Sequence, residues 1–132
     1  MALQLTVVTP ERRVLETEAD EIEMPGARGY LGILPGHAPL ITLLGTGVLT
    51  VRKGGSSTAL AVSSGLAEVS ADKVSVLADS AEGAAEIDAA AAERDRAKAE
   101  EEMKSAGVDT LDEIRTRLEL AQARISVARR PA

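Results

Sequence analysis

A single histidine is the main residue of this chain that could take part in catalysis. His37 stands between Gly36 and Ala38, and an imidazole there could serve as a general base. The chain has no cysteine and no second histidine, so it offers no thiol nucleophile, no zinc-thiolate site and no two-histidine zinc motif. A small hydrolase that uses His37 is one hypothesis, a turn residue is the other interpretation, and no metal site is predicted.

Neighbouring acids and a glycine-rich segment are the other patterns with chemical meaning. Asp20 with Glu21, and the run 100–102, pair carboxylates, but neither has the spacing of a calcium loop. A solvated strand edge and a helix face explain them. The segment 25–39 is rich in Gly and Pro, yet it contains no GxxxxGK[ST] phosphate loop and no helix pattern follows it. Turns and bulges of a β-sandwich are typical of such a segment.

Composition excludes several classes of function. The 132 residues carry a formal net charge of −6 and include one Tyr, with no Phe or Trp. Nucleic-acid binding is not expected, because it needs positive charge and stacking aromatics. No apolar run approaches the roughly 20 residues of a membrane span, and the N-terminus lacks the pattern of a secretory signal. These features favour a cytosolic chain without a membrane span of its own.

The first part of the chain, residues 1–82, has the pattern of a mainly β sandwich or barrel. Apolar and polar residues alternate with period two in short runs separated by turn residues, as in half-buried strands. About nine or ten short strands are predicted, with hairpin turns at Gly54-Gly55 and Asp72-Lys73. The runs are 3–7, 14–16, 19–24, 30–34, 40–44, 48–51, 59–62, 67–69 and 74–77. Because aromatics are nearly absent, the core must consist of Leu, Ile, Val and Ala.

Residues 83–132 have the pattern of an antiparallel two-helix hairpin. Residues 86–104 are almost entirely Ala, Glu, Lys and Arg, which are strong helix formers. Gly107 indicates the connection, and Thr110 with Glu113 reads as a capping box for the second helix. That helix carries an apolar seam with spacings of three and four residues, formed by Leu111, Ile114, Leu118, Ala121, Ile125 and Ala128. The first helix offers mostly alanine to the seam, so the two backbones can approach closely.

The chain resembles the epsilon-subunit family of the bacterial F-type, proton-transporting ATP synthase. The segments that carry the resemblance are LQLTVVTPERRVLE, GARGYLGILPGHAPLITLLGTGVL, VSVLADSAE and the Ala/Glu-rich hairpin, in the family's order. GILPGHAPL and LADSAE are the most specific of them. The resemblance implies a non-catalytic subunit of the central stalk, or rotor, which is not an enzyme by itself. Its expected partners are the gamma subunit, the c-ring and the alpha/beta catalytic head, and its expected place is peripheral, on the cytoplasmic face of the cell membrane.

The resemblance also implies two roles for the hairpin. The hairpin either folds down on the sandwich or extends into the catalytic head, where it inhibits ATP hydrolysis. The alternative function is a nucleotide-sensing module that binds ATP through a family motif, Ile/Leu-Asp-x-x-Arg-Ala. Ile87, Asp88 and Ala92 match this motif, but Ala91 takes the place of the arginine. The lost guanidinium removes a phosphate contact, so we expect either no cofactor or ATP as a weak regulatory ligand.

Two groups of residues are predicted to contact partners. The Gly- and Pro-rich segment has more apolar bulk than a solvent loop needs, which points to gamma or the rotor ring, although the same side chains could instead fill the sandwich core. The candidates there are Tyr30, Leu31, Ile33, Leu34, His37 and Leu40. The second helix is basic, and its arginines are candidate contacts with the beta subunit or, alternatively, only solubilise the helix. They are Arg115, Arg117, Arg124, Arg129 and Arg130.

Overall fold

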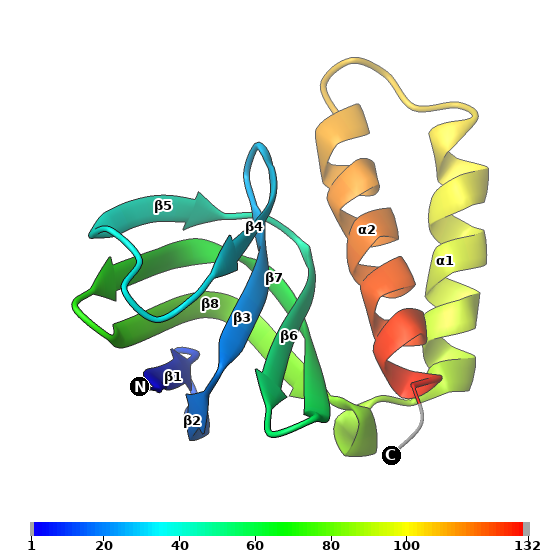
Figure 1. Cartoon of the computed structure of the whole chain (residues 1–132). Coiled ribbons are helices and arrows are strands. Elements are labelled where there is room, and N and C mark those ends of the chain that lie inside the picture. Colours follow the sequence, from blue (N-terminus) through cyan, green and yellow to red (C-terminus); the bar gives the residue numbers. More distant parts are fainter. Residues whose placement is uncertain (1, 131–132) are drawn as a thin grey trace.

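A computed structural model describes residues 2–130 as eight strands, a single 3-10 turn and two helices (Figure 1). The N-terminal strands are β1 Leu3–Val8, β2 Arg13–Ala19, β3 Glu21–Gly26 and β4 Gly29–Ile33. The remaining strands are β5 Leu40–Leu44, β6 Gly47–Lys53, β7 Ser56–Ser70 and β8 Lys73–Gly83. The 3-10 turn η1 Ala84–Glu86 leads to α1 Ala89–Met103 and α2 Leu111–Ala128. The predicted class, a β-sandwich followed by a two-helix hairpin, is confirmed.

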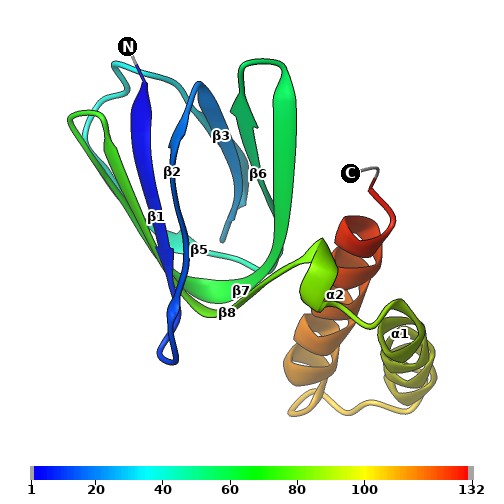
Figure 2. The ribbon, with the colours of Figure 1, turned by 90° about the horizontal axis from the view of Figure 1, so that it is seen from below.

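The long strand β7 joins the two layers of the sandwich. Its first half, 56–62, pairs with β6, and its second half, 65–69, pairs with β5. β8 runs antiparallel to β7 along most of its length, and β1 lies parallel to β8 on the other side. The strands therefore follow the order β2-β1-β8-β7-β5-β3-β4, with β6 between β3 and β7, and they enclose one core (Figure 2).

β7 explains why the described residues contain fewer strands than the sequence pattern predicts. Ser64-Gly65 reads as a turn between two strands, but the pairing with β8 continues through it, from Ser63 opposite Ser80 to Gly65 opposite Ala78. A Cβ at Gly65 would lie 1.9 Å from the carbonyl oxygen of Leu77. The glycine thus marks a close approach of two backbones inside a continuous strand.

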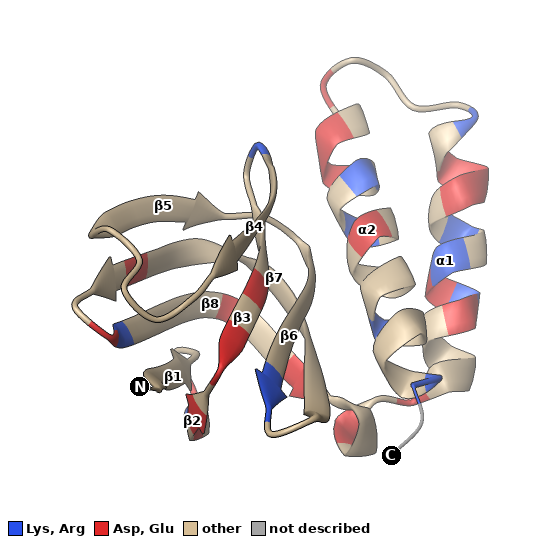
Figure 3. Cartoon of the chain, viewed as in Figure 1, with Lys and Arg blue, Asp and Glu red and all other residues tan. Residues whose placement is uncertain are grey.

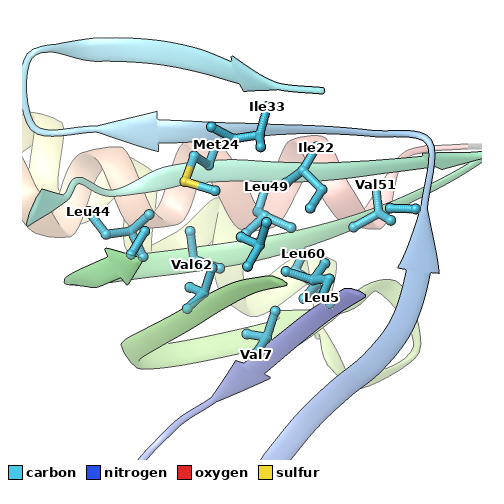
Figure 4. Close-up of a cluster of buried hydrophobic side chains, with 14 of the residues drawn as sticks. Leu5, Val7, Ile22, Met24, Ile33, Leu44, Leu49, Val51, Leu60 and Val62 are labelled. Atoms are coloured by element: carbon cyan, nitrogen blue, oxygen red, sulfur yellow. The ribbon is translucent and has the colours of Figure 1, made fainter. Parts of the chain in front are cut away.

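Aliphatic side chains fill the sandwich, as the lack of aromatics predicts. Inward residues of β1, β3, β4, β5, β6 and β7 meet there (Figure 4), and those of β8 belong to the same cluster. The largest fully buried ones are Leu3, Leu5, Ile22, Met24, Ile33 and Leu49. Burying each such side chain is worth about 1.5–3 kcal/mol, so the strands hold a core of their own.

The helix boundaries follow local capping chemistry. Asp88 is the N-cap of α1, where its Oδ1 accepts a hydrogen bond from the backbone N–H of Ala91 at 3.0 Å. The capping box predicted for α2 is absent: the hydroxyl of Thr110 bonds to the backbone of Gly107 instead. The reason is that Thr110 has helical φ and ψ, which turns its side chain back toward the connection.

The hairpin contacts the sandwich mainly through α2, which lies between the strands and α1 (Figure 2). Ala123 and Val127 of α2 are buried against Ala61 of β7, with Val48, Ala59 and Ile87 at the edge of the contact. The two helices pack against each other, and Ala92 and Ala99 of α1 are buried, as are Ile114, Ala121 and Ile125 of the seam of α2. The side chains at the sandwich contact are small, so we expect docking to be only modestly stable.

We predict that residues 1–84 fold without the hairpin. Every buried residue of the main core lies between Leu3 and Ala81, so removing the helices uncovers only the small patch around Ala61. The fragment should keep one cooperative thermal transition and well-dispersed amide NMR signals. Collapsed amide dispersion, typical of a molten globule, would contradict the expectation.

Candidate functional site

An exposed apolar row crosses the outer face of the sandwich. Leu43 of β5 lies opposite Leu66 of β7, and Leu66 lies opposite Leu77 of β8. Directly paired residues point to the same face of a sheet, and Ile41 joins that face two residues before Leu43. These four residues, hereafter the apolar row, are between 39% and 65% exposed. Val8 of β1, which lies opposite Leu77, extends the row and is half-buried.

Two shallow hollows flank the row at Ile41. One, of about 450 Å³, is lined by Pro39, Leu40, Ile41, Glu68, Val69 and Ser70. The other, of about 280 Å³, is lined by Ile41, Leu43, Leu31 and the turn around Arg28. Exposed bulky aliphatic side chains make this face a candidate protein-docking surface, and the two hollows are too open for a small-molecule site.

The segment predicted to be an interface is divided between core and surface. Ile33 is fully buried, and Leu31 and Leu40 pack against the core. The position of these three side chains agrees with the alternative interpretation, in which they fill the sandwich core. Tyr30 and Leu34 are more than half exposed. His37 is half-buried, and its Nδ1 lies 2.6 Å from the carbonyl oxygen of Ala38.

Tyr30 is held in place by the neighbouring strand. Its hydroxyl oxygen accepts a hydrogen bond from the backbone N–H of Val48 at 2.9 Å. A Cβ at Gly47 would stand 2.4 Å from that oxygen, so only glycine leaves room for the phenol. The one aromatic side chain of the protein therefore lies at the surface with a fixed orientation.

A pocket of about 240 Å³ lies where the sandwich, the linker and the hairpin meet, and we call it the hairpin pocket. All three residues that match the ATP motif, Ile87, Asp88 and Ala92, line it together with Ala91. The other lining residues are Glu82, Glu86, Asp95 and Arg124. The three motif residues are neighbours in the sequence, whereas the acids opposite them, which the sequence reasoning did not select, come from other parts of the fold or from farther along α1.

The hairpin pocket is acidic, and most of its acids have partners. Glu82 Oε1 accepts from Arg124 Nε at 2.7 Å. Glu86 pairs with Arg12 of the β1–β2 turn and also accepts from the backbone N–H of Gly83 at 3.1 Å. Asp88 caps α1. The charge distribution (Figure 3) therefore disfavours a triphosphate in this pocket.

The candidate arginines of α2 are engaged within the chain to different degrees. Arg117 forms a bidentate pair with Glu102 of α1 at 2.7 and 3.1 Å, and Arg129 pairs with Glu93 of α1. Arg124 pairs with the sandwich. Arg115 has a single long contact, 3.8 Å, to Asp112 of its own helix, and Arg130 is exposed.

Ion pairs join the two helices. A hydrogen bond from Arg96, and then the charge of Arg129, hold the pKa of Glu93 below its ordinary value. The hydrogen bond from Arg117 lowers the pKa of Glu102 in the same way. A carboxyl with a lowered pKa in the folded state stabilises the hairpin above the pKa of the unfolded chain. That contribution is lost as the pH falls through the lowered pKa, and it is small for groups so exposed to water.

The paired acids of the sequence have structural partners. Asp20 accepts from the backbone N–H of Gly54 at 2.7 Å, which supports the β6–β7 turn, and Glu21 pairs with Arg52. In the run 100–102, the carboxylates pair with Arg96, Lys104 and Arg117. These contacts explain both groups of acids as parts of turns and helix faces.

Comparison with known proteins matches this fold to one family. A family model described as "ATP synthase, Delta/Epsilon chain, beta-sandwich domain" matches residues 2–84, which is the whole sandwich. The chain belongs to this ATP synthase delta/epsilon family. The resemblance found in the sequence is confirmed.

Curated members of the delta/epsilon family resemble the chain over about half of its length. ATP synthase epsilon chains of Solibacter usitatus and Gloeobacter violaceus are each 49% identical, over 70 and 69 residues. An epsilon chain of Nostoc sp. is 49% identical over 74 residues, or 54% of either chain. The chain matches about half of the length of the first two relatives as well, 52% of each.

Solved structures of mitochondrial ATP synthases contain the same fold. A chain in the cryo-EM structure of the Euglena gracilis enzyme, OSCP/F1/c-ring, superposes with a TM-score of 0.81 at 22% identity, covering 96% of this chain and 81% of that one. A chain of the Tetrahymena thermophila central stalk/c-ring gives 0.61 at 13% identity, covering 97% of both. The likeness thus includes the hairpin. Between residues 2 and 130 no helix is long and apolar enough to cross a membrane.

Sequence reasoning missed the apolar row, although a signal was present. β5 is apolar on both faces, with Ile41 and Leu43 between the inward residues, and the pairs Leu66-Ala67 and Val76-Leu77 place apolar residues side by side. Adjacent apolar residues in a strand mean that both faces of the sheet are covered. The outer face here has no cover within residues 2–130, which makes it a candidate docking face.

Proposed function

We propose that this delta/epsilon-family protein is a non-catalytic subunit of the central stalk of a proton-transporting ATP synthase. Its sandwich docks on a gamma subunit and the c-ring and helps to couple rotation to ATP synthesis. The membrane association of the protein is then peripheral, at the cytoplasmic face, and follows from these partners. The single observation that carries the proposal is the apolar row on a sandwich that matches the family.

The apolar row has the properties that a permanent stalk contact requires. Exposed, contiguous aliphatic side chains are unfavourable on an isolated chain and mark an interaction surface. The row lies on strands whose inward faces form the core, so it is presented rigidly. Tyr30 and Leu34 are exposed on the strand and loop before β5, where they serve as candidate contacts to the c-ring.

The hairpin supplies regulation in this proposal. It docks through few and small side chains, which leaves a small free-energy difference between docked and released states, as a two-state element needs. When the helices separate, Arg117 and Arg129 lose their partners on α1 and can meet an acidic surface of the catalytic head. Inhibition of ATP hydrolysis by the extended hairpin is the expected consequence.

The test of the stalk function is co-expression with the gamma subunit of the same organism. The wild-type chain should co-purify with gamma as a stable complex at physiological salt. A chain that remains monomeric beside a correctly folded gamma subunit would refute the assignment. Substitutions in the row, described in the Discussion, then locate the contact.

A weak ATP site in the hairpin pocket is the second candidate function. The observation in its favour is that Ile87, Asp88 and Ala92 line one pocket. Against it stand the four carboxylates of that pocket and the alanine at position 91.

We predict that ATP binding by the wild-type chain is weaker than about 1 mM and that Ala91→Arg strengthens it about tenfold. The added guanidinium would make one charge-assisted phosphate contact, and the tenfold gain corresponds to about 1.4 kcal/mol, near the lower end of what such a contact contributes. Isothermal titration calorimetry measures the dissociation constant of ATP for the wild type and for Ala91→Arg. Ala90→Arg, at an exposed position outside the pocket lining, is the matched control. Micromolar binding by the wild type, or equal effects of the two arginines, would contradict this expectation.

A further inference from the structure

The contact between the hairpin and the sandwich contains one ion pair that is unlike the others. Glu82 lies near the end of β8, and Arg124 lies one turn before the end of α2, so their pair joins the two parts of the chain. Their side chains are 27% and 28% exposed, which makes this the least exposed ion pair between residues 2 and 130. A partly buried pair is screened less by solvent than a surface pair.

The surroundings of Arg124 make its charge more important than that of Glu82. Among the lining residues of the hairpin pocket within 2–130, Arg124 is the only basic one, against four carboxylates. Arg12 neutralises Glu86 from outside the pocket. If Arg124 were lost, Glu82 of the sandwich would face Asp88 and Asp95 of the hairpin without a cation between them.

The apolar part of the contact between hairpin and sandwich is small, so it contributes little free energy against that repulsion. It buries Ala123 and Val127 against Ala61, with Val48, Ala59 and Ile87 partly buried at its edge. Its alanines add little free energy because their buried area is small. We therefore expect the ion pair, and the neutralisation that it provides, to shift the balance between the docked and the released hairpin.

We propose that Arg124 holds the hairpin in the docked position on the sandwich. It does so by pairing with Glu82 and by neutralising the acidic pocket between the two parts of the chain. Loss of Arg124 releases the hairpin, whereas loss of Glu82 has a smaller effect because it also removes one of the repelling charges. The same guanidinium cannot contact a partner while it is paired. The consequence for partner contacts rests on the regulatory role proposed above, whereas the effect of Arg124 on docking does not.

The test measures docking in the isolated chain, so it does not depend on the ATP synthase. Because the chain has no cysteine, nitroxide labels can be placed at Ser56→Cys in the sandwich and Val108→Cys at the hairpin tip, both exposed. Pulsed EPR then gives one narrow distance for the docked hairpin and a broad distribution for the released one. Circular dichroism verifies that each variant retains its strands and helices.

Arg124→Gln should raise the ratio of released to docked chain about tenfold, and Glu82→Gln less than about threefold. The double variant Glu82→Gln/Arg124→Gln should dock better than Arg124→Gln alone, because one repelling carboxylate is gone. The charge swap Glu82→Arg/Arg124→Glu should restore part of the docking. Arg115→Gln, on an exposed face of the same helix, is the control and should match the wild type.

Two results would overturn the proposal. The first is an Arg124→Gln chain with the same docked fraction as the wild type and Arg115→Gln. The second is a double variant that is released as much as Arg124→Gln, which would show that repulsion by Glu82 does not drive the release. Added NaCl gives an independent readout, since it screens the repulsion between the pocket carboxylates and should increase docking of Arg124→Gln. A decrease in docking would count against the proposed role of Arg124.

Discussion

Replacing Leu43 by aspartate should weaken assembly with the gamma subunit about thirtyfold or more, because interface anchors of this size contribute about 2 kcal/mol or more. Leu43 lies in the middle of β5 with 64% of its surface exposed, opposite Leu66. Its substitution places a carboxylate in the apolar row without touching the core. Binding is measured by surface plasmon resonance or by co-purification with gamma.

The choice of residue separates binding from folding. Leu31 also belongs to the predicted interface, but it packs against the core, so Leu31→Asp would lower the stability of the sandwich as well. Val108→Asp is the matched control, because Val108 is almost fully exposed at the hairpin tip and far from the row. If Leu43→Asp binds gamma as tightly as Val108→Asp while its melting temperature is unchanged, the row is not the contact.

Truncation after Ala84 should raise ATP hydrolysis by the reconstituted catalytic head about threefold or more, a change of roughly 0.6 kcal/mol in the activation free energy. The truncation leaves the sandwich core intact, because the main core ends at Ala81. The chain then keeps its place on the stalk but cannot insert helices into the head. Steady-state hydrolysis of the assembled complex is the measurement.

A point substitution in α2 tests whether charge carries the inhibition. Arg115 is the suitable position, since its one ion pair within residues 2–130 is the long contact to Asp112 of its own helix, whereas changes at Arg117 or Arg124 also disturb the hairpin. Arg115→Ala should raise hydrolysis part of the way toward the truncated form, with Arg94→Ala on α1 as the control. Equal hydrolysis by the full chain, both variants and the truncated form would mean that the hairpin does not inhibit and that the protein acts in coupling alone.

Local patterns in the sequence were enough to predict the two parts of the chain, a β-sandwich and a helical hairpin. The alternation of Leu3, Leu5 and Val7 defines the inward face of β1 because side chains in a strand change face at every residue. The alanine-rich run before Lys104 predicts a helix for equally local reasons. The position of Ala91 in the ATP motif is also a property of the sequence alone, because it concerns which side chain is available and not where it lies.

Contacts between distant residues were decided only by the tertiary structure. Leu43, Leu66 and Leu77 form a row because three strands pair in one register, and that register depends on hydrogen bonds between segments far apart in the chain. β7 continues through Gly65 because β8 approaches it there. The pairing of Arg124 with Glu82 depends on which face of α2 lies against the sandwich, and the apolar seam of a helix does not specify that face when both of its neighbours are lined by alanine and valine.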